Sequence, residues 1–146
     1  MSIEFDIAIV GSGPSGLSAA ARAAQKGISH ILLETNDHAS DTIFKFQKRK
    51  FVMATPDVMP LRSDVSFSAG TREEILDKWD QEIEQQKINI SYASEVIEIS
   101  GEKGNFSLKV KDGRTIRASH VVLSIGMQGN LRKLDVEGDD WEGVQY

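Results

Sequence analysis

Hydrophobic residues follow two patterns in the first part of the chain. Residues 7–10 (IAIV) and residues 31–33 (ILL) are short, uninterrupted apolar runs. Such runs are typical of parallel strands that are buried on both faces. Between them, residues 15–26 are rich in alanine, which favours a helix with a slim face that packs closely on a sheet. The pattern therefore predicts a strand, a helix and a second strand, that is, a βαβ unit.

The next part of the chain has a different character. Residues 35–70 show little periodicity, and we expect a long irregular segment with one short helix near residues 41–47. A basic cluster within it is most often a solvated face, and the alternative is a second phosphate or partner site. The cluster consists of Lys45, Lys48, Arg49 and Lys50.

A clear helix is predicted after this segment, ending at about Gln86. Thr71 with Glu74 three residues later forms a capping box, which marks the start of a helix. An apolar stripe at helical spacing follows, and we interpret Trp79 on this stripe as a core residue. The stripe consists of Ile75, Leu76, Trp79 and Ile83.

From Ile88 onward the hydrophobic period is two, which indicates strands. A short strand is expected at residues 88–90, then strands at residues 96–99, 106–110 and 114–118 that form a three-stranded antiparallel meander, with Asp112-Gly113 as a hairpin turn. Residues 121–126 (VVLSIG) predict a second buried parallel strand that ends on glycine. We predict an α/β fold: a Rossmann-like parallel sheet with a glycine-rich βαβ start, plus this meander, in one domain over residues 1–146.

Candidate chemistry lies in the turn GSGPSG after the first strand. Gly11 permits a tight turn, Gly13 lets the backbone approach a pyrophosphate, and Gly16 lets the helix pack closely on the strand. The free amides and the dipole at the helix start form an anion site without a basic side chain. The candidate binding residues of this turn are Gly11, Ser12, Gly13, Pro14, Ser15 and Gly16.

An acid stands at the carboxyl end of the second predicted strand. Glu34, followed by Thr35, is where a carboxylate would accept hydrogen bonds from the ribose hydroxyls of an adenosine. A carboxylate here disfavours a 2′-phosphate, because two negative groups would meet. These residues alone leave NAD and FAD open, and the competing interpretation is a glycine-rich turn in an unrelated α/β protein.

Composition excludes several classes of function. The chain has 146 residues and a net charge of −5, so it has no general attraction for nucleic acid or an anionic membrane. It has no cysteine, which excludes a disulfide, a thiolate metal site and a redox dithiol within this chain, and no metal site is expected. The first residues are acidic, and no apolar run approaches the roughly 18 residues that span a bilayer, so we expect a cytoplasmic protein.

The order of motifs resembles the FAD-binding domain of the thioredoxin-reductase-like pyridine nucleotide-disulfide oxidoreductases. The resemblance covers nearly the whole chain and includes GSGPSG, Glu34, the capped helix, the meander, VVLSIG and LDVEG. It implies FAD as cofactor, with its ADP half held by the glycine-rich turn and Glu34. It also implies that Val96 presents backbone to the adenine and that Ser124, Ile125 and Gly126 pass near the flavin nucleotide.

Two departures from the family pattern stand out. Ser124-Ile125 replaces the usual Ala-Thr before Gly126, and the glycine pair that commonly follows the acid is missing. The stretch from Ala39 to Pro56 is more similar to the bacillithiol-disulfide-reductase-like branch, whose members also lack a redox cysteine pair near the flavin.

The resemblance also implies a reaction. Hydride would pass from NAD(P)H, bound in a second domain that this chain lacks, to FAD, and electrons would then pass to a disulfide, a redox partner protein or another acceptor. A homodimer is a further implication for the full-length protein. We name no catalytic acid or base, and we interpret His30, His38 and His120 as structural or solvated.

We therefore expect the N-terminal FAD-binding portion of a longer oxidoreductase, which binds FAD weakly and shows negligible turnover alone. Three alternatives stay open. The first is a non-enzymatic FAD- or adenine-nucleotide-binding module, and the second is a fragment of flavin monooxygenase type. The third is an NAD-binding domain, which we disfavour because the long segment and the meander replace the expected second strand and helix.

Overall fold

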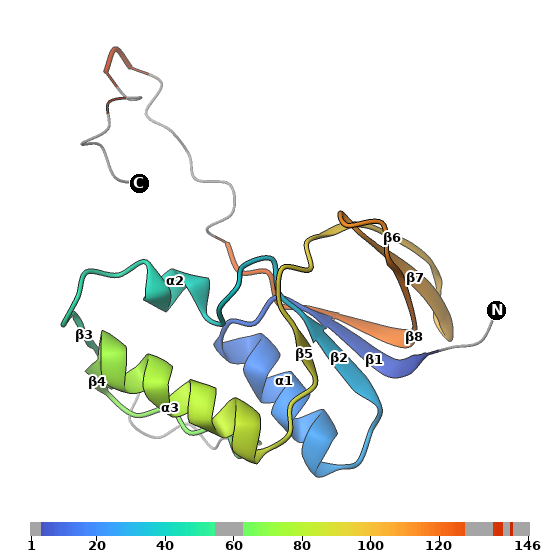
Figure 1. Cartoon of the computed structure of the whole chain (residues 1–146), viewed down its shortest axis with the longest axis horizontal. Helices are drawn as coiled ribbons and strands as arrows, with labels where there is room; N and C mark the ends of the chain where they lie inside the picture. The colour runs from blue at the N-terminus through green and yellow to red at the C-terminus, as the bar shows by residue number, and fades with distance from the viewer. Residues whose placement is uncertain (1–3, 55–62, 128–135, 139–140, 142–146) are drawn as a thin grey trace.

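The computed structural model describes residues 4–54, 63–127, 136–138 and 141. A six-stranded sheet with the order β5-β2-β1-β8-β7-β6 forms its centre (Figure 1). The elements, in chain order, are β1 (Phe5–Val10), α1 (Pro14–Gln25), β2 (His30–Leu33), α2 (Asp41–Phe44), β3 (Phe51–Val52), β4 (Gly70–Thr71), α3 (Arg72–Gln85), β5 (Ile90–Ser91), β6 (Val96–Glu102), β7 (Asn105–Val110) and β8 (Thr115–Leu123).

The predicted βαβ start is present. β1 and β2 pair in parallel, with Ile9 opposite Leu32, and α1 connects them. α1 begins at Pro14, where the missing N–H costs little, and it is followed by Gly27 at φ +66°, a conformation that glycine adopts without strain.

A second βαβ unit follows, contrary to the sequence-based expectation. β5 pairs in parallel with β2, with Leu32 opposite Ile90, and α3 is the helix that precedes β5. The long segment therefore does not replace the second helix and strand but is inserted between β2 and α3. It holds α2 and a short β3–β4 pair, with Phe51 opposite Thr71, which the sequence did not predict.

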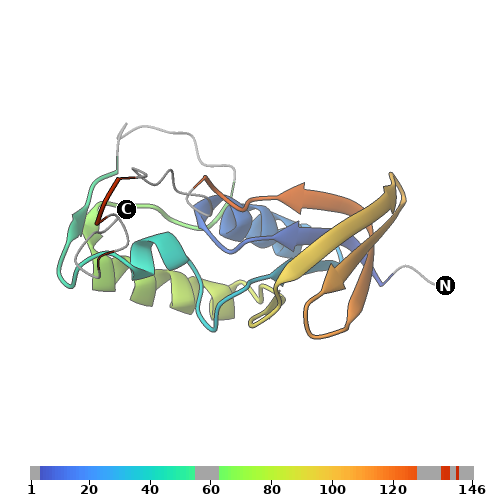
Figure 2. The same cartoon turned by 90° about the horizontal axis from the view of Figure 1, so that it is seen from above.

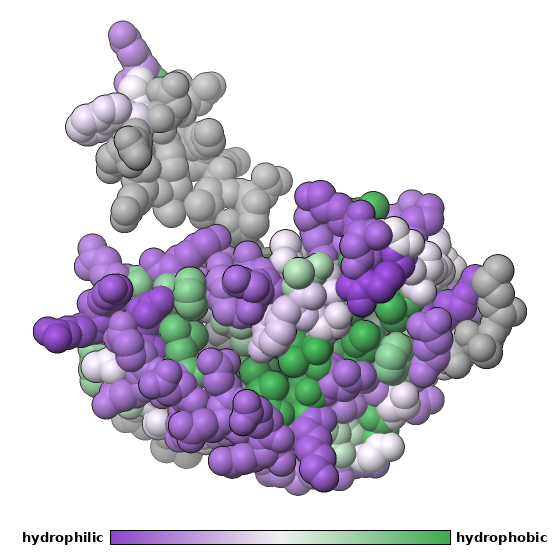
Figure 3. Space-filling view, in the orientation of Figure 1, coloured by the Kyte–Doolittle hydropathy of each residue, from purple (hydrophilic) through white to green (hydrophobic). Residues whose placement is uncertain are grey.

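The sheet has different neighbours on its two faces. Alternate residues of β1 and β2 point to opposite sides, so Ile9 and Leu32 pack with α1 and α3 in one core cluster. Ala8 and Leu33 join the meander in the other cluster. Figure 2 shows β6 and β7 inclined across the parallel strands, and Figure 3 shows the hydrophilic outer surface of α3.

β8 belongs to both halves of the sheet. It pairs antiparallel with β7, with Leu108 opposite Ile116, and then parallel with β1, with Ile9 opposite Val122. The third meander strand and the VVL run, predicted as two strands, are thus one. Val122 and Leu123 are 37% and 63% exposed, so the prediction of a buried strand is wrong at this end. The reason is that beyond Ala118, β8 pairs only with β1 among the described strands.

The predicted start of α3 is confirmed. The Thr71 hydroxyl accepts from the Glu74 amide, and the Glu74 carboxylate accepts from the Thr71 amide at 2.8 Å, which is a complete capping box. Trp79 is 2% exposed within the core, as predicted, and its indole N–H donates to the Ser66 carbonyl at 3.0 Å. No helix in the described part of the chain is both long and apolar enough to cross a bilayer.

Candidate functional site: a groove at the carboxyl ends of the parallel strands

A groove of about 990 Å³ lies where β1, β2 and β8 end. This volume is at the upper end of the usual range for small-molecule sites. In open α/β sheets, the crevice outside the carboxyl ends of the strands is the usual place for a ligand. The lining comprises Val10, Gly11, Ser12, Gly13, Pro14, Ser15, Glu34, Thr35, Asn36, Ser40, Asp41, Thr42, Ile43, Lys45, Phe46, Gln47, Lys50, Leu123, Ser124, Ile125 and Gly126.

The glycines of the turn between β1 and α1 have different surroundings. Gly11 has φ +96°, and a Cβ on it would lie 2.6 Å from the Ser124 carbonyl oxygen. A Cβ on Gly16 would lie 1.8 Å from the Gly11 carbonyl oxygen, so Gly16 is needed for close packing, as predicted, and does not line the groove. A Cβ on Gly13 would meet nothing within 4 Å. The fold itself does not require Gly13 for space, which fits a backbone that must leave room for a ligand.

The start of α1 lines the groove and has features that suit an anion. The first N–H groups of any α-helix lack partners within the helix, and its dipole places partial positive charge there. The first turn of α1 contains no acidic residue, and its N-cap, Gly13, has no side chain that could cap the free amides. Pro14 and Ser15 line the groove beside it. The residues present therefore fit a pyrophosphate.

Glu34 is buried and fully hydrogen bonded. It is 6% exposed, and one carboxylate oxygen accepts from both the amide, at 3.0 Å, and the hydroxyl of Ser12. The other accepts from the amide and the side-chain N–H of Asn36, at 2.9 and 3.0 Å. A carboxylate has about four acceptor positions, so these donors occupy them all. A ribose hydroxyl can bond this carboxylate only by displacing one of them.

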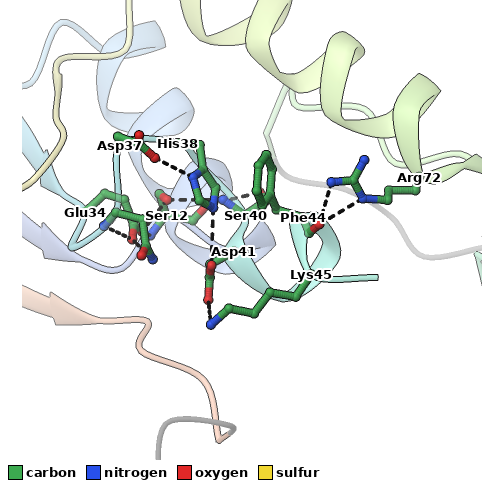
Figure 4. A network of polar contacts seen from close by, with 10 residues as sticks. Ser12, Glu34, Asp37, His38, Ser40, Asp41, Phe44, Lys45 and Arg72 are labelled. Atoms are coloured by element: carbon green, nitrogen blue, oxygen red, sulfur yellow. Dashed lines mark hydrogen bonds and ion pairs between the residues drawn. The ribbon is translucent and has the colours of Figure 1, made fainter. Parts of the chain in front are cut away.

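Ser12 also joins the turn to the start of α2. Its carbonyl accepts from the Ser40 amide and hydroxyl, both at 3.2 Å, and Ser40 has φ +59° (Figure 4). Ser12 was predicted to line the site, but its bond to Glu34 was not, and Asn36 and Ser40 were missed. The only sequence signal was a small polar residue inside the glycine-rich turn and an Asn two positions after the acid.

Ser124, just after β8, links the end of that strand by hydrogen bonds to the turn between β1 and α1. Its hydroxyl lies 2.9 Å from the Val10 carbonyl and 2.8 Å from that of Gly11, and its amide donates to Val10 at 2.9 Å. The hydroxyl fills the space beside Gly16, where a Cβ would come within 2.7 Å of it. Ser124, Ile125 and Gly126 all line the groove beyond the end of β8.

Val96 does not line the groove. It begins β6 and packs against the second core cluster. The backbone two residues before Val96 does contact Glu34, because the Ser94 amide donates to the Glu34 carbonyl at 2.7 Å. The prediction that Val96 presents backbone to an adenine stays a prediction.

Charged side chains form the wall contributed by α2. Lys45 pairs with Asp41 at 2.7 Å, and Asp41 also contacts the His38 ring at 3.2 Å (Figure 4). The hydrogen bond from His38 lowers the pKa of the exposed Asp37 carboxyl. Of the basic cluster, Lys45 and Lys50 line the groove, whereas Lys48 and Arg49 do not.

Two ionisable groups near this region have raised pKa values. Burial, with smaller contributions from Asp80 and Glu34, raises the pKa of the Tyr92 hydroxyl. Burial and the neighbouring Asp77 and Glu84 raise the pKa of the Asp80 carboxyl. Neither group lines the groove, so neither is placed to act on a ligand there.

His30 and His120 are hydrogen bonded within the fold. His30 contacts the Ile28 carbonyl at 3.0 Å through Nδ1 and accepts from the Asn89 amide at 3.2 Å through Nε2. His120 contacts the Asp6 carbonyl at 3.3 Å. Within the residues that the structure describes, no three side chains of His, Asp or Glu gather as a metal site would require.

Fold and groove together define a dinucleotide-binding domain of the Rossmann type. The model of the pyridine nucleotide-disulphide oxidoreductase family matches residues 8–146. The chain therefore belongs to this family, whose members are FAD-binding flavoproteins.

Two curated relatives are named as reductases, and both are longer than this chain. The chain is 24% identical over 127 residues to a ferredoxin–NADP reductase of Lactiplantibacillus plantarum, covering 86% of this chain and 35% of that protein. It is 27% identical over 148 residues to one component of the alkyl hydroperoxide reductase of Xanthomonas campestris, covering 97% of this chain and 25% of that protein. The chain thus spans about a third or less of the length of these two relatives.

Solved structures support the fold. The bacillithiol disulfide reductase of Staphylococcus aureus has a TM-score of 0.79 at 20% identity, covering 97% of this chain and 44% of that one. The thioredoxin reductase of Lactococcus lactis has a TM-score of 0.72 at 20% identity, covering 92% of this chain and 39% of that one. The predicted α/β fold with a Rossmann-like sheet and an antiparallel meander is confirmed.

Proposed function

We propose that residues 1–146 are the FAD-binding domain of an NAD(P)H-dependent flavin oxidoreductase. Electrons would pass from NAD(P)H through FAD to a disulfide or to a redox partner protein. The observation that carries the proposal is one groove in which the open Gly13, the start of α1 and Glu34 lie together. The similarity to longer proteins that are named as reductases supports the proposal.

The proposal assigns a role to each part of the groove. Backbone amides between Gly11 and Gly16 hold the pyrophosphate. The Glu34 carboxylate accepts from a ribose hydroxyl, which replaces one of its hydrogen bonds from Ser12 or Asn36. Val96 contributes backbone on the adenine side. Ser124, Ile125 and Gly126 form the wall beside the flavin nucleotide.

The chemistry that FAD would supply when bound is to accept a hydride and then to release electrons. The residues of this chain bind and orient it. Asp41 and Lys45 neutralise each other at 2.7 Å, so the α2 wall adds little net charge beside the pyrophosphate. NAD(P)H would bind outside this domain. A homodimeric full-length protein and a cytoplasmic location complete the proposal.

Thermal denaturation with added ligands tests the proposal. A ligand present at 100 times its Kd stabilises the native state by about 2.7 kcal/mol, so binding raises Tm. We expect FAD to raise Tm, ADP to raise it less at equal concentration, and NAD to raise it least. A clear preference for NAD over FAD would contradict the proposed cofactor.

Gly13→Val is the matched variant for this titration. The Cβ position is open, so the variant should fold, while its branched side chain should enter the pyrophosphate position and abolish the FAD-induced shift. A variant that responds to FAD as the wild type does would remove Gly13 from the site.

A further inference from the structure

The basic cluster at residues 45–50 divides into two groups. Lys48 and Arg49 lie outside the groove, whereas Lys45 and Lys50 line it. Lys45 is paired with Asp41 at 2.7 Å, which cancels its charge locally. The Lys50 ammonium lies 4.8 Å from the centre of the Phe46 ring, and no carboxylate pairs with it among the residues that the structure describes. Lys50 is therefore an uncompensated cation facing the groove.

Backbone hydrogen bonds fix the position of Lys50. Its amide donates to the Gln47 carbonyl at 3.0 Å, and its carbonyl accepts from the Arg72 amide at 2.8 Å. The next residue, Phe51, pairs with Thr71 in the β3–β4 ladder. The Phe46 amide donates to Ile43 at 3.0 Å, and its ring packs on the core. An ammonium over an aromatic face is attracted to it, so the backbone is fixed and the exposed side chain favours a position over the Phe46 ring.

Lys50 and Glu34 line the same groove from different parts of the chain. Figure 1 shows α2 leading from the end of β2 to the β3–β4 pair, and Lys50 immediately precedes β3. The groove also has an aliphatic part of its lining, because Leu123 and Ile125 are 63% and 67% exposed and both line it. A lining that combines an aromatic ring, a cation and aliphatic side chains suits a flat, partly apolar ring system.

We propose that Lys50 sets the redox preference of the flavin by stabilising its reduced, anionic form. This inference rests on the proposed function, with adenosine beside Glu34 and the isoalloxazine ring beside Lys50. Reduction adds two electrons and one proton, which a hydride from NAD(P)H supplies together, and NAD(P)⁺ leaves. Neutral oxidised FAD becomes FADH⁻, with its negative charge on the pyrimidine part of the ring. A cation nearby binds that form more tightly than the oxidised one.

The test is the midpoint potential of bound FAD, measured on the whole chain by equilibration with a reference dye and a reductant. In Lys50→Met, the preference for reduced over oxidised FAD should fall about tenfold, which lowers the two-electron potential by about 30 mV. Lys50→Arg keeps the charge and should stay near the wild-type potential. Lys48→Met removes a charge from the same segment outside the groove and should leave the potential unchanged.

The outcomes separate this inference from the proposed function. If the wild type binds no FAD, the proposed function fails. If FAD binds and Lys50→Met has the wild-type potential, or Lys48→Met shifts it equally, Lys50 is not the determinant. If Lys50→Met weakens ADP as much as FAD, Lys50 serves the pyrophosphate and the inference is overturned. Lys50→Gln serves as a second variant, and circular dichroism checks the folding of both.

Discussion

At the scale of single residues, the turn between β1 and α1 separates structural from ligand-related glycines. Gly16→Ala would place a Cβ 1.8 Å from the Gly11 carbonyl oxygen, which must then shift. We expect Gly16→Ala to lower the free energy of unfolding by about 1–3 kcal/mol more than Gly13→Ala, because overpacking has that cost. Urea denaturation of both variants measures it, and equal losses would contradict the difference in packing.

Glu34 is expected to matter for stability even without a ligand. In Glu34→Gln, one carbonyl oxygen and an NH₂ replace two acceptor oxygens, so donors from Ser12 or Asn36 lose their partner. Leaving a buried donor unsatisfied costs about 1–3 kcal/mol. The measurement is urea denaturation of the ligand-free protein. Glu98→Gln, which breaks an exposed ion pair with Lys109, is the control and should cost at most about 1 kcal/mol. A loss in Glu34→Gln as small as the control's would mean that the carboxylate is free for ribose.

At the scale of elements, α3 depends on its cap. Thr71→Ala removes the hydroxyl that accepts from the Glu74 amide. The expected cost is about 1 kcal/mol, the usual value for an N-cap. Chemical denaturation followed by circular dichroism measures it, and Thr71→Ser should retain most of the stability. Similar losses in the Ala and Ser variants would argue against the cap.

The same cap makes stability depend on pH. Hydrogen bonds from the Thr71 amide and hydroxyl lower the pKa of the Glu74 carboxyl from its ordinary value of 4.5. A lowered carboxyl pKa stabilises the fold above the unfolded-state pKa, and that contribution is lost as pH falls through the folded-state value. The wild type should therefore lose more stability below pH 4.5 than Glu74→Gln does. Unfolding curves at several pH values test this, with Glu102→Gln as an exposed control that should follow the wild type.

Local sequence signals predicted the elements that they control directly. The apolar runs of β1 and β2 and the box at Thr71 are complete within a few residues, and both predictions are confirmed. The β3–β4 pair was missed because Phe51 and Thr71 are far apart in sequence and each strand has only 2 residues. For the same reason the sequence placed Glu34 but not its bond to Ser12, which spans 22 positions. Sequence distance does not explain the other donor, Asn36, which lies two positions after Glu34 and was also missed.

At the scale of the molecule, the two core clusters share the strands of one sheet. Leu108 is fully buried in the meander cluster, and Leu108→Ala should cost about 2–5 kcal/mol. Because β8 pairs with both β7 and β1, we expect the whole domain to unfold in one transition. In a Trp141→Phe background, Leu108→Ala should lower the unfolding midpoint seen by fluorescence of Trp79, which lies in the other cluster. The midpoint seen by circular dichroism should fall by the same amount. Separate transitions would show that the two halves unfold independently.

β8 also limits which changes in chain length this protein can accept. Its residues 115–118 are in register with β7, and residues 118–123 are in register with β1. One inserted or deleted residue inside β8 would move either the meander or the segment from Ser124 to Gly126 by one position. Since a shift of one residue turns every side chain to the opposite face, no local adjustment would restore both. Length variation is therefore best tolerated in the turns at residues 103–104 and 111–114, and a library of single-residue insertions should recover folded variants there and not within β8.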